Sequence, residues 1–292
     1  MKTLGFIGTG GMGSGMAANL LKGGNQLFVN DLEPERCKLL LDQGAKFAQT
    51  PKDIAESCDI VFSMLPNNDA VKEVGCGING LINARKGANV WIDLSSIDKE
   101  TIVYTQKIFA NSRWTLMDGA AGGVEEVAAA GQLQIWVSGN ISSFEKYSKF
   151  FTPMAKSVMY VGELGNAKLV KNAMAMLAAV NHMAILEIFS WLKQGGLTAS
   201  TFESIMGDSM WNSAASRNIM RKVTTGKYKP RKSWMPKDVG FGLEIARDME
   251  VPMPFVSLAS QMFSIAQATE NDEWEATGIA ANVYDLINKK TK

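Results

Sequence analysis

The sequence contains a single histidine, His182, and only three cysteines among its 292 residues. A reaction that needs an imidazole base therefore has one candidate, and a histidine on an apolar helix is more often a core residue than a catalyst. Cys37, Cys58 and Cys76 are odd in number and follow no metal-ligand spacing. We therefore expect no metal site, and we interpret the three cysteines as reduced thiols of a cytoplasmic protein.

The chain also lacks an excess of charge and a long apolar run. Lys and Arg total 30 against 29 Asp and Glu, so the formal net charge of +1 indicates no nucleic-acid or membrane-binding surface. The longest apolar stretch, Ala173 to Val180, is too short to cross a bilayer. A strand is predicted almost at the N-terminus, so we expect no signal or transit peptide. The composition, with 46% hydrophobic and 20% charged residues, is typical of a soluble globular protein of two domains.

The stretch from Thr3 to Leu20, TLGFIGTGGMGSGMAANL, predicts a strand, a tight glycine turn and a helix. Gly8 permits the turn, Gly10 allows the backbone to approach a pyrophosphate, and Gly13 allows the helix to pack against its strand. The free N–H groups and dipole of the helix then favour the anion. The pattern predicts dinucleotide binding, with a purely structural glycine turn as the alternative. The residues of this stretch that are predicted to bind the cofactor are Gly8, Gly10, Gly11, Met12 and Gly13.

A second predicted strand, Gln26 to Asn30, is followed by Asp31, eighteen residues after the last glycine of the motif. A carboxylate at this place accepts hydrogen bonds from an adenosine ribose and repels a 2′-phosphate, for which a site would need an arginine. The next residue is Leu32, so NAD is favoured over NADP, although Arg36 lies one helical turn further. Alternatively, Asp31 is a turn residue that caps the helix predicted from Glu33 to Leu41.

Further predicted strands alternate with helical patterns. The strands are Ile60–Met64, Val90–Asp93, Leu116–Asp118, Gln134–Val137 and Ser157–Val161. The helices between them include Pro51–Ser57, Asn68–Val74 and Ile102–Asn111. This alternation predicts a parallel, doubly wound sheet that binds its ligand at the carboxyl ends of the strands. The segments that follow three of these ends, Met64–Asn67, Asp93–Ser96 and Asp118–Gly123, would face the cofactor.

After Gly162 the pattern changes. Residues 166 to 194 contain no proline or glycine and predict one helix of about 40 Å. The segments beyond it have a helical period: Thr198–Met206, Ala214–Val223, Val239–Met249, Val256–Ala268 and Trp274–Ile287. We therefore predict an α/β dinucleotide-binding domain at residues 1–163 and an all-helical substrate and dimerisation domain at residues 164–292, joined by the long helix. A cleft between two domains is the default place for a substrate.

With these motifs in place, the chain resembles the β-hydroxyacid dehydrogenase family, which includes 3-hydroxyisobutyrate dehydrogenase and tartronate semialdehyde reductase. The similarity covers nearly the whole length and rests on Gly5–Leu20, Met64–Asn68, Asp93–Ser96, Gly122–Leu133, Gly162–Asn172 and Lys237–Pro254. It implies a Rossmann domain followed by a helical domain. It also implies reversible hydride transfer between NAD(P) and a small anionic hydroxy acid or aldehyde acid, and a homodimer or homotetramer.

The resemblance implies a lysine general acid/base in the long helix. The family's lysine lies six residues after the second glycine of a G-x-x-G pair, which is Lys171 when counted from Gly165. A rival register matches Lys168 and Asn172 to the family's lysine and asparagine but needs a deletion. A lysine beside an oxidised nicotinamide has its pKa lowered towards the working pH by desolvation and like charge, as acid/base catalysis requires. Either lysine is alternatively a solvated residue of an amphipathic helix.

Four further cofactor contacts are implied by the resemblance. Leu65 and Pro66 would line the nicotinamide ribose, Ser96 would contact the ribose or the amide, and Lys237 would reach the cofactor from the helical domain. Each of the last two has a structural alternative, because Ser96 is also a candidate helix N-cap and Lys237 lies beside acidic residues.

Two positions depart from the family. The serine that usually binds substrate is Gly122, and the asparagine four residues after the lysine is Ala175. The backbone N–H groups of Gly122 and Gly123 are still available for a substrate carboxylate. These departures keep two alternatives open, a dinucleotide-binding scaffold with weak or no catalysis and an imine-type reductase.

The segment Lys227–Lys232 carries four basic residues in six, and surface solvation is its simplest role. Our sharper hypothesis is that Arg231 or Lys232 reaches the substrate and selects an acid with a second anionic group.

Overall fold

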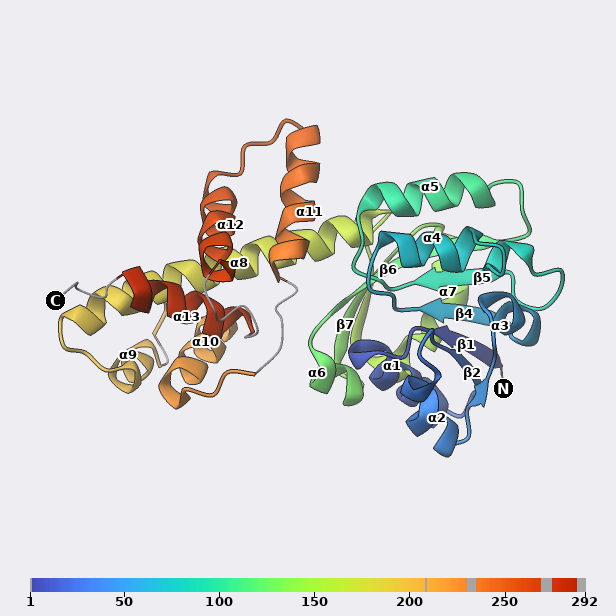
Figure 1. Ribbon diagram of the computed structural model, residues 1–292, viewed down its shortest axis with the longest axis horizontal. Helices are drawn as coiled ribbons and strands as arrows, with labels where there is room; N and C mark the ends of the chain where they lie inside the picture. The colour runs from blue at the N-terminus through green and yellow to red at the C-terminus, as the bar shows by residue number, and fades with distance from the viewer. Residues whose placement is uncertain (1, 208, 230–234, 269–274, 288–292) are drawn as a thin grey trace. The chain divides into compact units, whose positions relative to one another are not determined.

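The structure is a computed structural model that describes residues 2–207, 209–229, 235–268 and 275–287. The chain divides into two compact units, Met1–Lys171 and Asn172–Lys292. The first unit is a sheet covered by helices, and the second is helical throughout its described part (Figure 1). The predicted fold class, a doubly wound α/β domain followed by a helical domain, is confirmed.

An eight-stranded sheet in the order β3-β2-β1-β4-β5-β6-β7-β8 forms the first unit. Its strands are β1 (Thr3–Ile7), β2 (Gln26–Asn30), β3 (Lys46–Phe47), β4 (Ile60–Ser63), β5 (Val90–Asp93), β6 (Thr115–Gly122), β7 (Leu133–Ser138) and β8 (Ala155–Tyr160). Strands β1 to β6 are parallel, as expected from the sequence. The last two strands differ from the predicted all-parallel sheet, because β7 is antiparallel to β6 and β8 is parallel to β7. The segment between β6 and β7 is too short for the crossover that a parallel pair needs, so β7 runs back along β6.

Helices cover both faces of this sheet. They are α1 (Gly11–Lys22), α2 (Lys38–Asp42), α3 (Pro51–Ser57), α4 (Asn68–Cys76), α5 (Lys99–Phe109), α6 (Glu125–Ala129) and α7 (Ile141–Tyr147), with 3₁₀ turns at Pro34–Cys37, Leu81–Asn83, Ser148–Phe150 and Thr152–Met154. Successive strand residues point to opposite faces. Phe62 therefore packs in the core beneath α1, and its neighbour Val61 packs in the core beneath α3, α4 and α5. This alternation explains why the central strands are apolar throughout.

The long helix α8 (Asn166–Gln194) begins in the first unit and has the bounds that the sequence predicts. The other helices of the second unit are α9 (Ala199–Met206), α10 (Ala214–Thr225), α11 (Met235–Asp248), α12 (Pro254–Gln267) and α13 (Ala276–Ile287). Met176, Ala179, Met183 and Leu186 of α8 are buried against these helices. By length and composition alone, α8 is apolar enough to cross a membrane, but core helices of soluble proteins share this property.

Candidate active site at the carboxyl ends of the strands

The glycine turn after β1 has the geometry that the sequence predicts. Gly8 adopts φ +90°, which favours glycine, and its N–H donates to the carbonyl oxygen of Asn30 at 2.9 Å. A Cβ on Gly13 would lie 1.9 Å from the carbonyl oxygen of Gly8, so only glycine allows α1 to approach the turn. Gly10 caps α1 and has no side chain to bond the first N–H groups of the helix, which Gly11 begins. These N–H groups therefore remain available for an anion such as a pyrophosphate.

Asp31, at the end of β2, is joined to this turn. Its carboxylate accepts hydrogen bonds from the backbone N–H of Thr9 at 2.7 Å and of Glu33 at 3.0 Å. Arg36 makes a bidentate pair with Glu33, at 2.7 and 3.0 Å, and lies beside Gly10. The carboxylate of Asp31 is thus fixed beside the glycine turn, and the nearby guanidinium of Arg36 is engaged by Glu33.

The ends of β4 and β5 are joined by hydrogen bonds as well. The hydroxyl of Ser95 donates to Asp93 at 2.6 Å and accepts from the backbone N–H of Leu65 at 2.8 Å. Leu65 also lies against the glycine turn, since its Cδ2 would be 3.0 Å from a Cβ on Gly8. Leu65, a predicted cofactor residue, therefore lies against the glycine turn, and its exposed neighbour Pro66 follows it.

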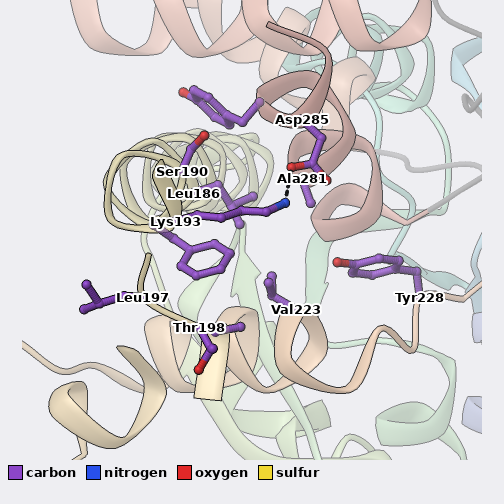
Figure 2. A pocket seen from close by; sticks show the side chains of 12 residues that line it. Leu186, Ser190, Lys193, Leu197, Thr198, Val223, Tyr228, Ala281 and Asp285 are labelled. Atoms are coloured by element: carbon purple, nitrogen blue, oxygen red, sulfur yellow. Dashed lines mark hydrogen bonds and ion pairs between the residues drawn. The ribbon is translucent and has the colours of Figure 1, made fainter. Parts of the chain in front are cut away.

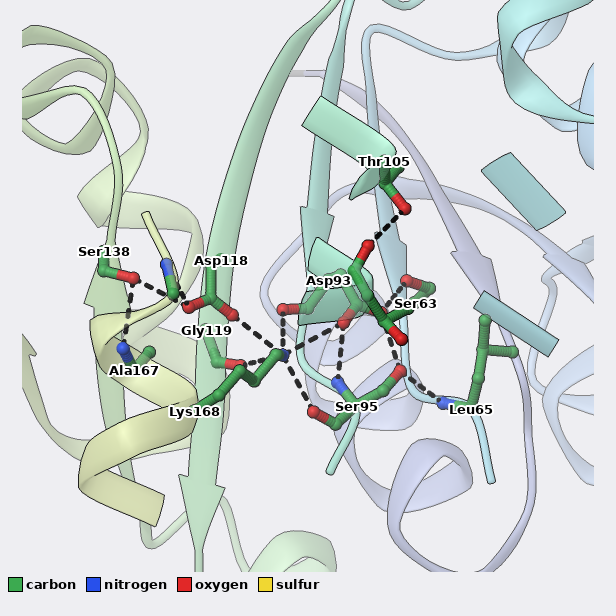
Figure 3. A network of polar contacts seen from close by, with 12 residues as sticks. Ser63, Leu65, Asp93, Ser95, Thr105, Asp118, Gly119, Ser138, Ala167 and Lys168 are labelled. Carbon is green, nitrogen blue, oxygen red and sulfur yellow. Dashed lines mark hydrogen bonds and ion pairs between the residues drawn. The ribbon is translucent and has the colours of Figure 1, made fainter. Parts of the chain in front are cut away.

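Lys168 is the centre of a buried polar network (Figure 3). Its Nζ lies 3.0 Å from a carboxylate oxygen of Asp93 and 2.8 Å from one of Asp118, and none of the three side chains is exposed. The same amine donates to the carbonyl oxygens of Ser95 and Gly119, both at 2.8 Å. Sequence reasoning placed the two aspartates at strand ends but missed the network, because nothing in the order of residues shows that Lys168 reaches both.

This environment determines the charge of Lys168. Burial alone would lower the pKa of its ammonium, but the adjacent carboxylates of Asp118 and Asp93 outweigh burial and hold the pKa above its usual value. Lys168 therefore stays protonated and cannot exchange a proton with a substrate near neutral pH. This environment does not favour the rival register, in which Lys168 is the acid/base.

Lys171 lies one turn further along α8. Its half-buried side chain donates from Nζ to the carbonyl oxygen of Ala121 at 3.0 Å, next to the last residue of β6. The two lysines therefore have different surroundings. Lys171 contacts the end of β6, which the sequence predicts to bind ligand, whereas Lys168 is enclosed by Asp93 and Asp118.

Gly122 ends β6, and Gly123 follows it. A Cβ on Gly122 would lie 2.6 Å from the Cη2 atom of Trp136 on β7, so the indole fills the place of the side chain that the family usually has there. Gly123 has φ +148° and is exposed. The role of Trp136 was missed, because the sequence does not show which β7 residue lies beside Gly122.

The remaining predicted residues are two cofactor candidates, Ser96 and Lys237, the departure Ala175, and two residues outside the described part. Ser96 is half-buried, and the helix after it is capped by Asp98, so the alternative of Ser96 as N-cap is wrong. Lys237, on α11 of the second unit, lies 3.7 Å from Asp238 and over the ring of Phe241. Arg231 and Lys232 lie outside the described residues. Ala175 packs against the helical core.

His182 is a core residue, as its apolar helix indicates. Its Nδ1 lies 2.7 Å from the carbonyl oxygen of Ala178 and its Nε2 3.1 Å from the hydroxyl of Thr277. Burial lowers the pKa of the imidazole, which therefore stays neutral at pH 7. Within the described ranges, no group of three or more His, Cys, Asp or Glu side chains is placed to hold a metal ion.

Two cavities in the described part of the chain are lined by other residues. One of about 400 Å³ lies among α8, α9, α10 and α13 of the second unit, beside the ion pair of Lys193 and Asp285 at 2.7 Å (Figure 2). Another of about 560 Å³ lies in the first unit, lined by Thr115 at the start of β6 and Gly139 after β7. Neither cavity contains a residue that the sequence predicts to bind cofactor or substrate, so the strand ends stay the candidate site.

Residues 3–162 match a family described as the NAD binding domain of 6-phosphogluconate dehydrogenase. Residues 165–283 match one described as NAD-binding of NADP-dependent 3-hydroxyisobutyrate dehydrogenase. The chain is 30% identical over 268 residues to 2-(hydroxymethyl)glutarate dehydrogenase of Eubacterium barkeri, covering 91% of this chain and 89% of that protein.

Two other proteins are similar to this chain at lower sequence identity. The chain is 24% identical over 280 residues to human cytokine-like nuclear factor N-PAC, which covers 95% of this chain but only 51% of N-PAC. A solved structure of Mycobacterium tuberculosis 3-hydroxyisobutyrate dehydrogenase with L-serine superimposes with a TM-score of 0.87, at 24% identity and 99% coverage of both chains. The structural similarity shows a shared fold.

Proposed function

The chain belongs to the β-hydroxyacid dehydrogenase family, whose activity is oxidation and reduction with NAD(P), and we propose that it uses Lys171 as the general acid/base. The proposed reaction transfers a hydride between NAD(H) and a small 3-hydroxy acid or its semialdehyde. The nicotinamide, when bound, supplies or accepts the hydride. The chain's own residues bind the cofactor and substrate and move the proton at the substrate oxygen.

The different bonding of the two lysines carries this proposal. Lys168 is held between two carboxylates with no exposed atoms, whereas the half-buried Lys171 donates from its amine to the carbonyl oxygen of Ala121 near the end of β6. A general acid/base must reach the substrate and change its protonation state. The partial exposure of Lys171 and its place near the end of β6 support it as this group over the enclosed Lys168.

The glycine turn supports cofactor binding. Gly8 and Gly13 leave no room for side chains, and α1 offers uncapped N–H groups to a diphosphate. The preference for NAD is supported by Asp31, whose carboxylate would repel a 2′-phosphate, and by Arg36, whose guanidinium is already paired with Glu33. We therefore propose NAD as the cofactor.

The substrate is proposed to be a small anionic acid. Gly122 ends β6 and Gly123 follows it, close to the carbonyl group of Ala121 that Lys171 binds. The N–H of Gly122 points away from that carbonyl and towards β7, so the N–H of Gly123 is the better candidate to bind a carboxylate. The relative from Eubacterium barkeri is named for a hydroxymethyl dicarboxylic acid. A dicarboxylate is therefore the first substrate to test, and selection of its second carboxylate by Arg231 stays a prediction.

The test measures NADH-dependent reduction of a panel of semialdehydes and NAD-dependent oxidation of the matching 3-hydroxy acids. Loss of the acid/base in Lys171→Ala should lower kcat by about 10²–10⁴-fold while NADH binding is retained. Lys193→Ala, on the same helix but paired with Asp285, is the matched control and should keep full activity. Saturable NADH binding without turnover of any panel member would favour a non-catalytic scaffold instead.

A further inference from the structure

Two lysines of α8 bind the same edge of β6. Strand β5 ends at Asp93, which pairs with Asp118, whereas β6 continues to Gly122. Past Asp118, β5 has no residues left to pair with β6. Lys168 donates to the carbonyl oxygen of Gly119 at 2.8 Å, and Lys171 donates to that of Ala121 at 3.0 Å. Carbonyl groups of alternate strand residues point to the same side, so the two amines complete the edge that β5 leaves open.

The first turn of α8 is fixed by the same network. The N–H of Gly165 donates to Asp118 at 3.1 Å, and the N–H of Ala167 donates at 3.1 Å to the hydroxyl of Ser138, which itself donates to Asp118 at 2.8 Å. Asp118 thus binds the backbone of the helix start and the side chain of Lys168 together. The start of α8 can neither slide nor rotate without breaking several buried bonds.

Residues three apart on a helix lie on the same face. Fixing Lys168 therefore also fixes the direction in which Lys171 leaves the helix. Lys168 is ion-paired to Asp93 of β5 and Asp118 of β6. These ion pairs fix the position of Lys171 relative to both strands whose ends form the candidate site.

We propose that Lys168 is a positioning residue, which fixes the first turn of α8 to the ends of β5 and β6 and so places the amine of Lys171. This inference deepens the proposed function, because the amine that Lys168 places is the proposed acid/base. Lys168 contacts neither substrate nor cofactor in this account and acts only through Lys171.

The charges around this turn predict opposite shifts in the titration of Lys171 in two variants, which a general loss of structure would not produce. Among the described residues, the charged groups that contact this turn include Asp93 on β5, Asp118 on β6, Lys168 on α8 itself, and Lys99 on α5, whose side chain lies against Gly165. Lys168→Met removes a cation and leaves two carboxylates, so the ammonium form of Lys171 is favoured and its titration moves to higher pH. Asp118→Asn removes an anion and should move the titration to lower pH.

The experiment uses the full chain and two readouts. Steady-state kinetics compare kcat, KM and their pH profiles. The second readout does not depend on turnover. Lysine amines are reductively dimethylated with ¹³C-formaldehyde and a borohydride-type reductant and are titrated by NMR, and the Lys171 signal is assigned by its absence in Lys171→Arg. Lys222→Met is the matched control, because it breaks a largely buried ion pair with Glu275, 2.8 Å long, in the second unit.

We expect Lys168→Met to lower kcat on the order of 100-fold, since a displacement of about 1 Å has this effect, with KM for NADH nearly unchanged. The Lys171 signal should titrate higher in Lys168→Met, lower in Asp118→Asn and unchanged in Lys222→Met. If Lys168→Met does not fold, the shift in Asp118→Asn decides.

Each other outcome is decisive as well. An unmoved Lys171 titration in the folded Lys168→Met or Asp118→Asn variants would overturn the inference, whether or not kcat falls. Shifts in the expected directions in a protein that turns over no hydroxy acid would support the placement of Lys171 by Lys168 and overturn the proposed function.

Discussion

The indole of Trp136 occupies the space that a side chain on Gly122 would need, with its Cη2 atom 2.6 Å from the place of a Cβ. The two residues lie on neighbouring antiparallel strands, where Gly122 pairs with Gln134 and Trp136 pairs with Ala120. Glycine at the end of β6 and tryptophan on β7 therefore depend on each other.

Gly122→Ser should destabilise the first unit, because the indole of Trp136 has to move from a packed position. Overpacking of this kind costs about 1–3 kcal/mol of unfolding free energy. Urea unfolding of Gly122→Ser, Trp136→Ala and the double variant measures the coupling, and the double variant should lose less than the sum of the single ones. Strict additivity would contradict the close approach of the two residues.

Gly13→Ala should weaken NADH binding strongly, because its Cβ would lie 1.9 Å from the carbonyl oxygen of Gly8 and force α1 away from the turn. Gly240→Ala on α11 is the control, since nothing lies within 4 Å of the added Cβ. This control should be neutral or stabilising by up to about 1 kcal/mol through helix propensity. Equal NADH affinity of the two variants, measured by fluorescence titration, would count against the glycine turn as the phosphate site.

Glu33→Gln should shift cofactor preference towards NADP. It breaks the bidentate pair that engages Arg36, which lies beside Gly10 and would then be available to a 2′-phosphate. A charge-assisted hydrogen bond contributes about 1.5–3 kcal/mol, so the ratio of NADPH to NADH affinity should rise roughly tenfold or more. Adding Arg36→Ala should remove the gain. A gain that persists without Arg36 would rule out this explanation.

The stability of the helical unit should fall in mild acid because of His182. Burial lowers the pKa of this imidazole below its ordinary value of 6.5, so the unfolded chain binds a proton more readily than the folded one. The contribution of neutral His182 to the free energy of unfolding is therefore complete above pH 6.5. It is lost as the pH falls through the lowered pKa that His182 has in the folded protein. Thermal unfolding between pH 7.5 and 5 should show this loss in the wild type and less of it in His182→Gln. Parallel pH curves for the two proteins would assign the loss to another group.

Local sequence predicted most of the fold. The bounds of β2, β5, α3 and α8 follow directly from apolar periodicity, and the glycine turn has the predicted backbone. The reversed direction of β7 and β8 depends on the length of a connection rather than on any strand's own residues. The short β3 was missed because two residues carry too little periodicity.

The geometry of the site could be predicted only where a side chain or a backbone conformation depends on its neighbours in sequence. Asp31 and Gly8 lie where the motif places them, because their roles depend on neighbours in the same turn. The choice between Lys168 and Lys171 depends on Asp93 and Asp118, which are far away in sequence, so counting residues left both registers open.

A crystal structure with NADH and a non-reacting 3-hydroxy acid bound tests the central claim most directly, through the distance from each lysine amine to the substrate's hydroxyl oxygen. We expect Nζ of Lys171 to lie within hydrogen-bond reach of that oxygen, about 3 Å, with Lys168 still enclosed by Asp93 and Asp118. Lys171 turned away from the substrate, or Lys168 released from its carboxylates to face it, would contradict the account.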